Sequence, residues 1–401
     1  MLCPAGHDQR GKRANPELAN VFSAYGDRLP ALSPHQARTV QAILSCRTAA
    51  LGGRVLACDH CDHSDVTYNS CRNRNCPKCQ GLDEVRWVER QQKLLLPTEY
   101  HHVVFTVSDV LHPLLLGNPR EGYGLLFRAV ASTLKEVGLR PSNLGARIGF
   151  TAVLHTWNQL LEHHPHLHCI VPGGGLSLDG QRWVSAKPRF LFNVDILMLV
   201  FRGKFLNLLE KAIASGEFRA ADGDGLATLR RAASKKWHVY SKPPFAGPEQ
   251  VLRYLGRYTH RIAISNSRLV SMKDGKLTLR WRDRRDNNQS KLKTLDAELF
   301  LRRFLLHILP PGFMRIRHYG ILANSRRKED ITTCRKFLAI DVTPAEPDEG
   351  DHEESWQELL LRVTGKDVTL CPECGVGHLH VLETIAEPRR RARSPPSSRT
   401  P

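Results

Sequence analysis

The stretch HHPHLHCIVPGGG, residues 163–175, places four histidines within six positions and continues into an apolar segment and three glycines. The apolar residues after the histidines are typical of a buried strand. Side chains two positions apart in a strand point to the same side, so His166 and His168 share one face. Two neighbouring imidazoles on a rigid strand form a platform for a divalent metal ion. We expect His163 and His164 to lie in the preceding turn, as further ligands or as phosphate contacts.

Two imidazoles leave room for a third, harder ligand. Gln159 lies seven residues before His166, and its amide oxygen could serve. An oxygen donor suits Mg²⁺ or Mn²⁺ better than zinc. The alternatives for this third position are His155 and Glu162. The glycines that follow predict a turn and not a phosphate loop, because no Lys-Ser/Thr pair and no helix start come after them.

A candidate nucleophile lies in VLRYLGRYTHRIAISN, residues 251–266. Tyr254 and Tyr258 are four residues apart, so they share one face of a helix. A tyrosine hydroxyl that attacks phosphorus forms a covalent phosphotyrosine and divides one difficult displacement into two easier steps. The alternative is a pair of structural tyrosines in an amphipathic helix. Three basic side chains of the same stretch are expected to contact DNA: Arg253, Arg257 and Arg261.

Two CxxC pairs predict a structural zinc site near the N-terminus. Cys58 and Cys61 form the first pair, and fourteen residues separate it from Cys76 and Cys79. Pairs at this spacing can place four thiolates tetrahedrally around one Zn²⁺. An iron site and a redox-active pair are the alternatives. Basic residues between the ligands are expected to contact phosphates: Arg72, Arg74 and Lys78.

Further cysteines lie outside this pattern. We expect Cys46 and Cys71 to be buried thiols, which is common for unliganded cysteine. Cys371 and Cys374 form another CxxC pair, and with His378 and His380 they resemble half of a second zinc site.

The composition indicates a globular protein with a polyanionic partner. The chain has 401 residues, a hydrophobic content of 41% and a formal net charge of +18. Such a charge favours nucleic acid as the partner. No apolar run is long enough to span a membrane, and the N-terminus has no apolar segment of a secretory signal. Cysteines in CxxC pairs then predict metal binding in a reducing cytoplasm. Nothing in the sequence indicates an oligomeric state.

The central part of the chain predicts an α+β fold. Residues 97–326 alternate β-branched strand patterns with helical patterns, and neighbouring strands follow each other directly. Lys273, Asp274 and Gly275 separate two alternating runs and predict a hairpin. Adjacent strands and hairpins favour a mixed or antiparallel sheet over a doubly wound parallel one. Ser33 before Pro34 predicts the start of a helix.

Several motifs resemble one known family. HHPHLHCIVPGGG resembles the His-hydrophobic-His motif of HUH single-strand endonucleases, and YLGRYTHRIAISN resembles the paired-tyrosine motif of the rolling-circle transposases of the insertion sequence 91 family. The block CRTAALGG…CDHC…NSCRNRNCPKCQ is similar to that family's zinc-binding domain. LHTWNQ, RRFLLHILPPGF and IRHYGILAN resemble it as well, so the resemblance runs from about residue 16 to residue 380.

The resemblance implies a fold and an activity. The fold is an HUH palm, a mainly antiparallel sheet flanked by helices with the histidine strand central and the tyrosine helix packed across it. The activity is nicking and joining of single-stranded DNA at transposon ends and target, through a 5′-phosphotyrosine link and a free 3′-hydroxyl, without ATP. The carried-over roles are metal ligands for His166 and His168, nucleophiles for Tyr254 and Tyr258, and zinc ligands for Cys58, Cys61, Cys76 and Cys79. Mg²⁺ or Mn²⁺ would be the catalytic ion.

Two positions depart from the family's pattern. Asn158 stands where glycine is expected, which affects the placement of Gln159. Arg54 stands where relatives often have histidine. Other activities remain as alternatives: a replication initiator or relaxase with the same chemistry, or a non-catalytic zinc-dependent DNA-binding protein.

The sequence also predicts a division of the chain. The expected segments are an arm (1–30), a zinc-binding DNA-binding domain (31–95), an HUH-type catalytic domain (96–326), a linker with a helix (327–365), a small zinc knuckle (366–384) and a disordered basic tail (385–401).

Overall fold

The structure is a computed structural model that describes residues 15–79, 81–219, 224–242, 256, 263–283, 286–338 and 354–388. Tyr254, Tyr258 and the three arginines of their stretch lie outside the described residues, as does the basic tail from residue 389.

A five-stranded antiparallel sheet forms the centre of the protein, in the order β13-β5-β6-β3-β9. The histidine stretch forms the middle strand, β6 (His163–Pro172). Its neighbours are β5 (Gly149–Trp157) and β3 (Tyr100–Thr106), while β13 (Ile316–Gly320) and β9 (His238–Lys242) form the edges. The expected α+β class with a central histidine strand is therefore confirmed.

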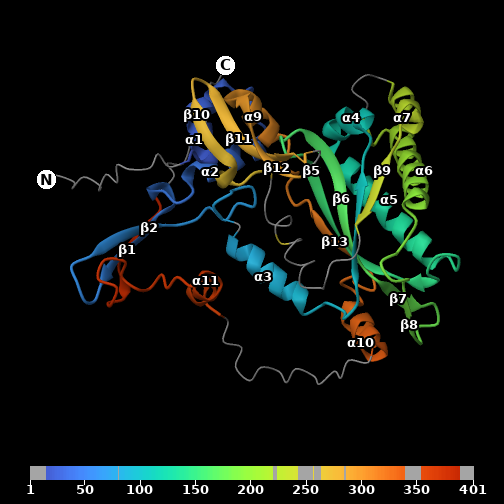
Figure 1. The fold of residues 1–401 in the computed structure, drawn as a ribbon. Coiled ribbons are helices and arrows are strands. Elements are labelled where there is room, and N and C mark those ends of the chain that lie inside the picture. Colours follow the sequence, from blue (N-terminus) through green and yellow to red (C-terminus); the bar gives the residue numbers. More distant parts are fainter. Residues whose placement is uncertain are drawn as a thin grey trace, which may run out of the picture.

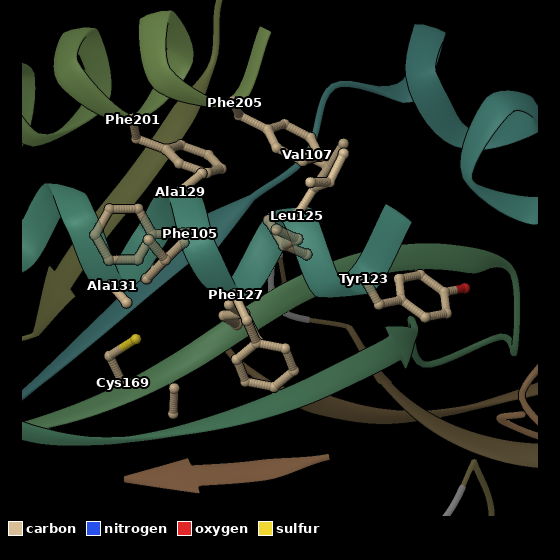
Figure 2. Packing of buried hydrophobic residues seen from close by; sticks show 14 of the residues in the cluster. Phe105, Val107, Tyr123, Leu125, Phe127, Ala129, Ala131, Cys169, Phe201 and Phe205 are labelled. Atoms are coloured by element: carbon tan, nitrogen blue, oxygen red, sulfur yellow. The ribbon is translucent and has the colours of Figure 1, made fainter. Parts of the chain in front are cut away.

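Helices cover both faces of this sheet (Figure 1). On one face lie α5 (Pro119–Leu139) and α6 (Val194–Ala214), with the short α4 (His112–Gly117) and α7 (Gly225–Ser234) beside them. Figure 2 shows Phe105 of β3 near Phe201 of α6, with ring centroids 5.2 Å apart, and Phe127 on the side of α5 that faces away from Phe201 and Phe205. These four rings are fully buried, as expected for a core that depends on apolar area removed from water.

The opposite face of the sheet is covered by α3 (Gly81–Gln92). Trp87 and Val88 of this helix pack with Tyr100, Val153 and Ile170 of the sheet. Because these sheet residues have the same parity as His168 in the strand pairing, α3 lies on the histidine face.

A second core joins the N-terminal helices to residues much later in the chain. It combines α1 (Leu18–Tyr25) and α2 (Pro34–Ser45) with α9 (Ala297–Leu305) and the sheet β10-β11-β12. The strands are β10 (Leu269–Lys273), β11 (Lys276–Asp283) and β12 (Gln289–Asp296). The predicted hairpin is present: Asp274 and Gly275 both have positive φ, 49° and 73°, as a tight turn requires. Ser33 caps α2 with Gln36 in a capping box.

The N-terminal cysteine region forms a third sheet that includes the end of the described chain. Its order is β14-β1-β2, with β1 (Gly53–Cys58) between β2 (Ser64–Tyr68) and β14 (Leu379–Ile385). The C-terminal segment that the sequence predicted as a separate zinc knuckle thus contributes a strand to the N-terminal sheet. This sheet and the second core each join segments that the sequence analysis assigned to different domains.

The remaining elements are small. They comprise the sheet β4-β7-β8, formed by β4 (Ala146–Arg147), β7 (Gly174–Ser177) and β8 (Trp183–Ser185), and the helices α10 (Arg327–Phe337) and α11 (Trp356–Thr364). Among the described residues, no helix has the length and apolar character needed to cross a membrane.

Candidate functional site

Three histidines converge on one face of the central sheet. His155 of β5 lies directly opposite His166 of β6, and His168 follows two residues along the same strand. One ring nitrogen from each lies within 4.8 Å of the other two, a spacing that fits a shared metal ion. The ring centroids of His155 and His168 are 4.4 Å apart, and those of His166 and His168 are 4.8 Å apart. His155 and His168 are buried, so the group is rigidly held.

Hydrogen bonds orient two of these rings. His166 Nδ1 lies 2.6 Å from the carbonyl oxygen of His164, and since a carbonyl only accepts, Nδ1 carries the proton and Nε2 keeps its lone pair. His168 Nδ1 lies 2.8 Å from His102 Nε2 on β3. When Nδ1 of His168 donates to His102, the Nε2 of His168 keeps the lone pair that a metal ion needs. Such outer partners fix the tautomer of metal-binding histidines. The ring of Trp157 stacks on His155 at 4.7 Å.

The expected third ligand, Gln159, is not part of this group, and His155 takes its place. Gln159 Oε1 lies 3.5 Å from the backbone N–H of Arg282 on β11, away from the histidines. Gln159 lies in the turn between β5 and β6, beyond the point where the pairing of these strands becomes irregular, between His155 and Trp157. The strand period therefore does not bring its side chain to the histidine face. The Asn158 side chain accepts hydrogen bonds from the N–H groups of residues 160 and 162 and closes this turn.

Glu162 and His163, two other candidate metal ligands, have different partners. Glu162 accepts a hydrogen bond from Asn158 and forms an ion pair with Arg303 at 3.1 Å. His163 and His164 belong to β6 and not to the turn. His163 points to the opposite face, where its Nε2 lies 2.9 Å from the hydroxyl of Tyr123. Burial lowers the pKa of His163 to about 3, so this ring stays neutral.

The cysteines form two groups of four. The first group consists of Cys46, Cys71, Cys76 and Cys79. In this group the Sγ atoms of Cys46 and Cys79 are 3.4 Å apart, and those of Cys71 and Cys79 are 3.6 Å apart. Neighbouring thiols lower the pKa of Cys79, which favours the thiolate that binds zinc.

The second group joins the two ends of the described chain. It consists of Cys58, Cys61, Cys371 and Cys374. The Sγ atoms of Cys58 and Cys374 are 3.8 Å apart, as are those of Cys61 and Cys371. Backbone N–H groups of Val376 and Gly377 lower the pKa of Cys374 to about 6. A side chain at Gly377 would collide with Cys58, since an added Cβ would lie 2.5 Å from its Sγ.

The expected grouping of Cys58, Cys61, Cys76 and Cys79 around one ion is therefore wrong. Each CxxC pair finds its partners elsewhere, because β1 and β2 carry the first pair away from the second and towards β14. Cys46 and Cys71 are members of a four-cysteine group and not isolated thiols. Zn–S bonds of about 2.3 Å in a tetrahedron separate the sulfurs by about 3.8 Å, so both groups have the dimensions of a zinc site. Structural zinc is thus supported at two places.

The predicted DNA contacts differ in their surroundings. Arg72 is exposed. Lys78 forms an ion pair with Glu17. Arg74 donates hydrogen bonds to the backbone carbonyls of Phe313, at 3.0 Å, and of Pro310, at 3.3 Å.

Gly256 locates part of the tyrosine stretch. It is helical, buried and equidistant in sequence from the two tyrosines. A Cβ added to it would lie 2.6 Å from Val88 Cγ2 of α3. Gly256 therefore touches the helix that covers the histidine face of the sheet.

The comparisons with known proteins define the class of the protein as a transposase. Residues 149–329 match a family described as "Putative transposase", and residues 18–107 match a "Transposase zinc-binding domain". "Putative transposase y4qJ" of Sinorhizobium fredii (strain NBRC 101917 / NGR234) is 47% identical over 386 residues, which cover 92% of this chain and 96% of the relative. The "Transposase for insertion sequence element IS801" of Pseudomonas savastanoi pv. phaseolicola is 29% identical over 305 residues, or 72% and 70% of the two chains.

The chain belongs to the insertion sequence 91 family of transposases, as its motifs predicted. Among solved structures, a conjugative relaxase, TRWC, in complex with oriT DNA matches at 16% identity with a TM-score of 0.20, over 39% of this chain and 68% of the relaxase.

Two zinc ions per chain are expected in the purified protein. Replacing both Cys371 and Cys374 with serine should lower the content to one, because the first four-cysteine group does not use them. Elemental analysis of the purified protein measures this. Cys169→Ala, at a buried thiol outside both groups, is the matched control and should retain two. One zinc ion in the unmodified protein would contradict the second site.

His102→Gln should weaken Mn²⁺ binding about 10–100-fold, because His168 loses the partner that fixes its ring. Titration calorimetry with protein of verified zinc content measures the affinity. The neighbouring His101 is equally buried but points to the other face of β3, so His101→Gln is the control and should bind Mn²⁺ normally. Equal losses in both variants would show that the effect is only structural.

Proposed function

We propose that this transposase nicks and joins single-stranded DNA at the ends of its element through a 5′-phosphotyrosine intermediate. Tyr254 and Tyr258 are the proposed nucleophiles. His155, His166 and His168 are the proposed ligands of the catalytic metal ion. Repeated cycles of this reaction would move the element by a rolling-circle route.

The observation that carries the proposal is the three-histidine group on the face covered by α3. Gly256, between the two tyrosines in the sequence, touches α3 at Val88. Val88 packs with the residues of the sheet that share the histidine face. The contact of Gly256 with α3 supports the proposal, because α3 covers the side of the sheet where a metal-bound phosphate would lie.

The residues fit a divalent metal ion, since two of the three rings have their Nδ1 hydrogen-bonded and offer Nε2. When bound, the ion would polarise the scissile phosphate and stabilise its developing charge. The imidazole of His155 is a softer ligand than the amide oxygen of Gln159 that the sequence predicted. A site of three neutral imidazoles therefore favours Mn²⁺ over Mg²⁺.

The proposed reaction is a transesterification. The tyrosine Oη forms a bond to phosphorus, the bond from phosphorus to the 3′-oxygen breaks, and the tyrosine proton is released while the 3′-oxygen takes up a proton. One phosphodiester replaces another, so no external energy source is required. A second tyrosine would allow one DNA end to remain attached while the next strand is cleaved or joined.

Two other activities predict different behaviour. A replication initiator or relaxase would share the chemistry, but the match to a transposase along 96% of a curated relative favours transposition. A non-catalytic zinc-dependent DNA-binding protein would bind DNA without forming a covalent product.

The purified protein should form a covalent adduct with single-stranded oligonucleotides from the element's ends when Mn²⁺ is present. A denaturing gel detects the adduct as a band of protein and DNA. Tyr254→Phe and Tyr258→Phe together should abolish it, because no phenol remains in the stretch to attack phosphorus. Tyr240→Phe, at an exposed tyrosine of β9, is the control and should leave the adduct intact. A folded protein that gives no band with any end sequence would refute the catalytic proposal.

Gly256→Ala should slow adduct formation at least tenfold, because the new methyl group would meet Val88 and displace Gly256 from α3. Val88→Ala in the same chain removes the colliding methyl group and should restore most of the rate. Single-turnover assays of the single and double variants measure this compensation. If the double variant were as slow as Gly256→Ala alone, contact with Val88 would not be the cause of the slower rate.

A further inference from the structure

The β10-β11-β12 sheet exposes a row of positive charge on the side away from the second core. Side chains alternate along β11, so Leu277 and Leu279 are buried in the second core while Arg280 and Arg282 are exposed. The outer face of the sheet is the side of the even-numbered residues of β11 and β12. On it, the attachment points of the two arginines are about 7 Å apart, the rise of two strand residues.

The neighbours of these arginines on the outer face are not acidic. The strand pairing sets Leu292 opposite Arg280 and Ser290 opposite Arg282. Leu292 is 60% exposed, so this face is open to solvent. Asp296 is the one carboxylate that the three strands place on the outer face, and it lies at the other end of β12, opposite residue 276.

The positive charge is greatest where β11 turns towards β12. The stretch RWRDRR, residues 280–285, contains four arginines in six positions, of which the last two lie outside the described residues. The carboxylates of this region are engaged by a lysine: Asp283 and Asp286 lie 2.9 Å and 2.8 Å from Lys291 Nζ. This end of the sheet is therefore suited to bind a polyanion.

The same end of the sheet is tied to the turn between β5 and β6. Arg268 donates one hydrogen bond to the carbonyl of Arg280, at 2.9 Å, and another to the carbonyl of Gln159 in that turn. Gln159 Oε1 also lies 3.5 Å from the backbone N–H of Arg282. The three candidate metal ligands lie on β5 and β6, the strands that this turn joins. The row of arginines is thus connected directly to the strands of the metal centre.

The chemistry of the outer face fits the backbone of double-stranded DNA. Guanidinium groups match the geometry of phosphate, and hydroxyl groups also contact phosphates. Proteins that bind single strands stack the bases on aromatic side chains. The outer face of these three strands carries no aromatic side chain at any position that the structure describes, and Trp281 belongs to the opposite side. Contacts to phosphate without base stacking favour a duplex over a single strand.

We infer that the outer face of the β10-β11-β12 sheet binds the phosphate backbone of double-stranded DNA beside the single strand that enters the metal centre. Arg280 and Arg282 contact two phosphates of the duplex. This inference rests on the proposed function, because it takes the DNA at the end of the element as the ligand. It adds that the protein holds the junction between duplex and single strand.

Two DNA probes test the inference. The full zinc-loaded chain is titrated with a duplex of about 30 base pairs and with a polythymidine single strand of the same length, without Mg²⁺ or Mn²⁺, and fluorescence anisotropy gives the affinity. The double variant Arg280→Gln, Arg282→Gln should bind the duplex about tenfold more weakly, and its slope of log affinity against log salt should fall by about 1.8, the contribution of two phosphates. Its affinity for the single strand should stay unchanged.

The matched control removes the same number of charges elsewhere. Lys211→Gln with Arg230→Gln changes exposed residues of α6 and α7, in the helical layer on the other face of the central sheet, and should keep both affinities and both slopes. Thermal melting verifies that each variant is folded. If the double variant of β11 does not fold, Arg280→Gln and Arg282→Gln are tested singly, and each should lower the duplex slope by about 0.9.

The outcomes separate this inference from the proposed function. A folded variant of β11 with unchanged duplex affinity and slope would overturn the inference. Equal losses with both probes would overturn it as well, because the face would then not select the duplex. A covalent adduct with unchanged duplex binding would leave the proposed function standing alone. A loss of duplex binding in a protein that forms no adduct would support the surface and refute the chemistry.

Discussion

The antiparallel pairing of β5 with β6 is the constraint on which the rest of the protein depends. It sets His155 opposite His166, and the two-residue period of β6 then adds His168 to the same face. A shift of β6 by one residue would turn His166 and His168 into the core that α5 and α6 fill. The apolar side chains between the histidines resist such a shift, because they are buried against those helices. The packing of one face therefore determines the chemistry of the other.

The zinc-binding region packs against other parts of the chain and, through α3, against the central sheet. Cys46 and Cys76 lie in the same hydrophobic cluster as α1, α9 and the β10–β12 sheet. The α3 helix, which follows the last cysteine of that group, covers the histidine face and touches Gly256. Metal binding at the cysteines would thus stabilise the segment that Gly256 contacts.

Short-range patterns made much of the fold predictable. The histidine strand, the hairpin at Asp274 and Gly275 and the helix after Ser33 were all predicted, because strand period, turn residues and caps act within a few residues. His155 was only one of two alternatives to Gln159, and the cysteine groups were not predicted, because both depend on which distant segments meet. Eight cysteines in CxxC pairs and singles can be grouped in many ways, and spacing favoured the wrong one.

The two cysteine groups also differ in when they can form. The first needs only residues up to 79, so it can close while most of the chain is still being synthesised. The second needs Cys371 and Cys374, and β14 can join β1 only after the central sheet has been translated. A ribosome that stops early therefore releases a chain whose N-terminal sheet lacks a strand and half of a metal site. The N-terminal sheet and its second metal site are therefore complete only after residues 371–385 have been synthesised.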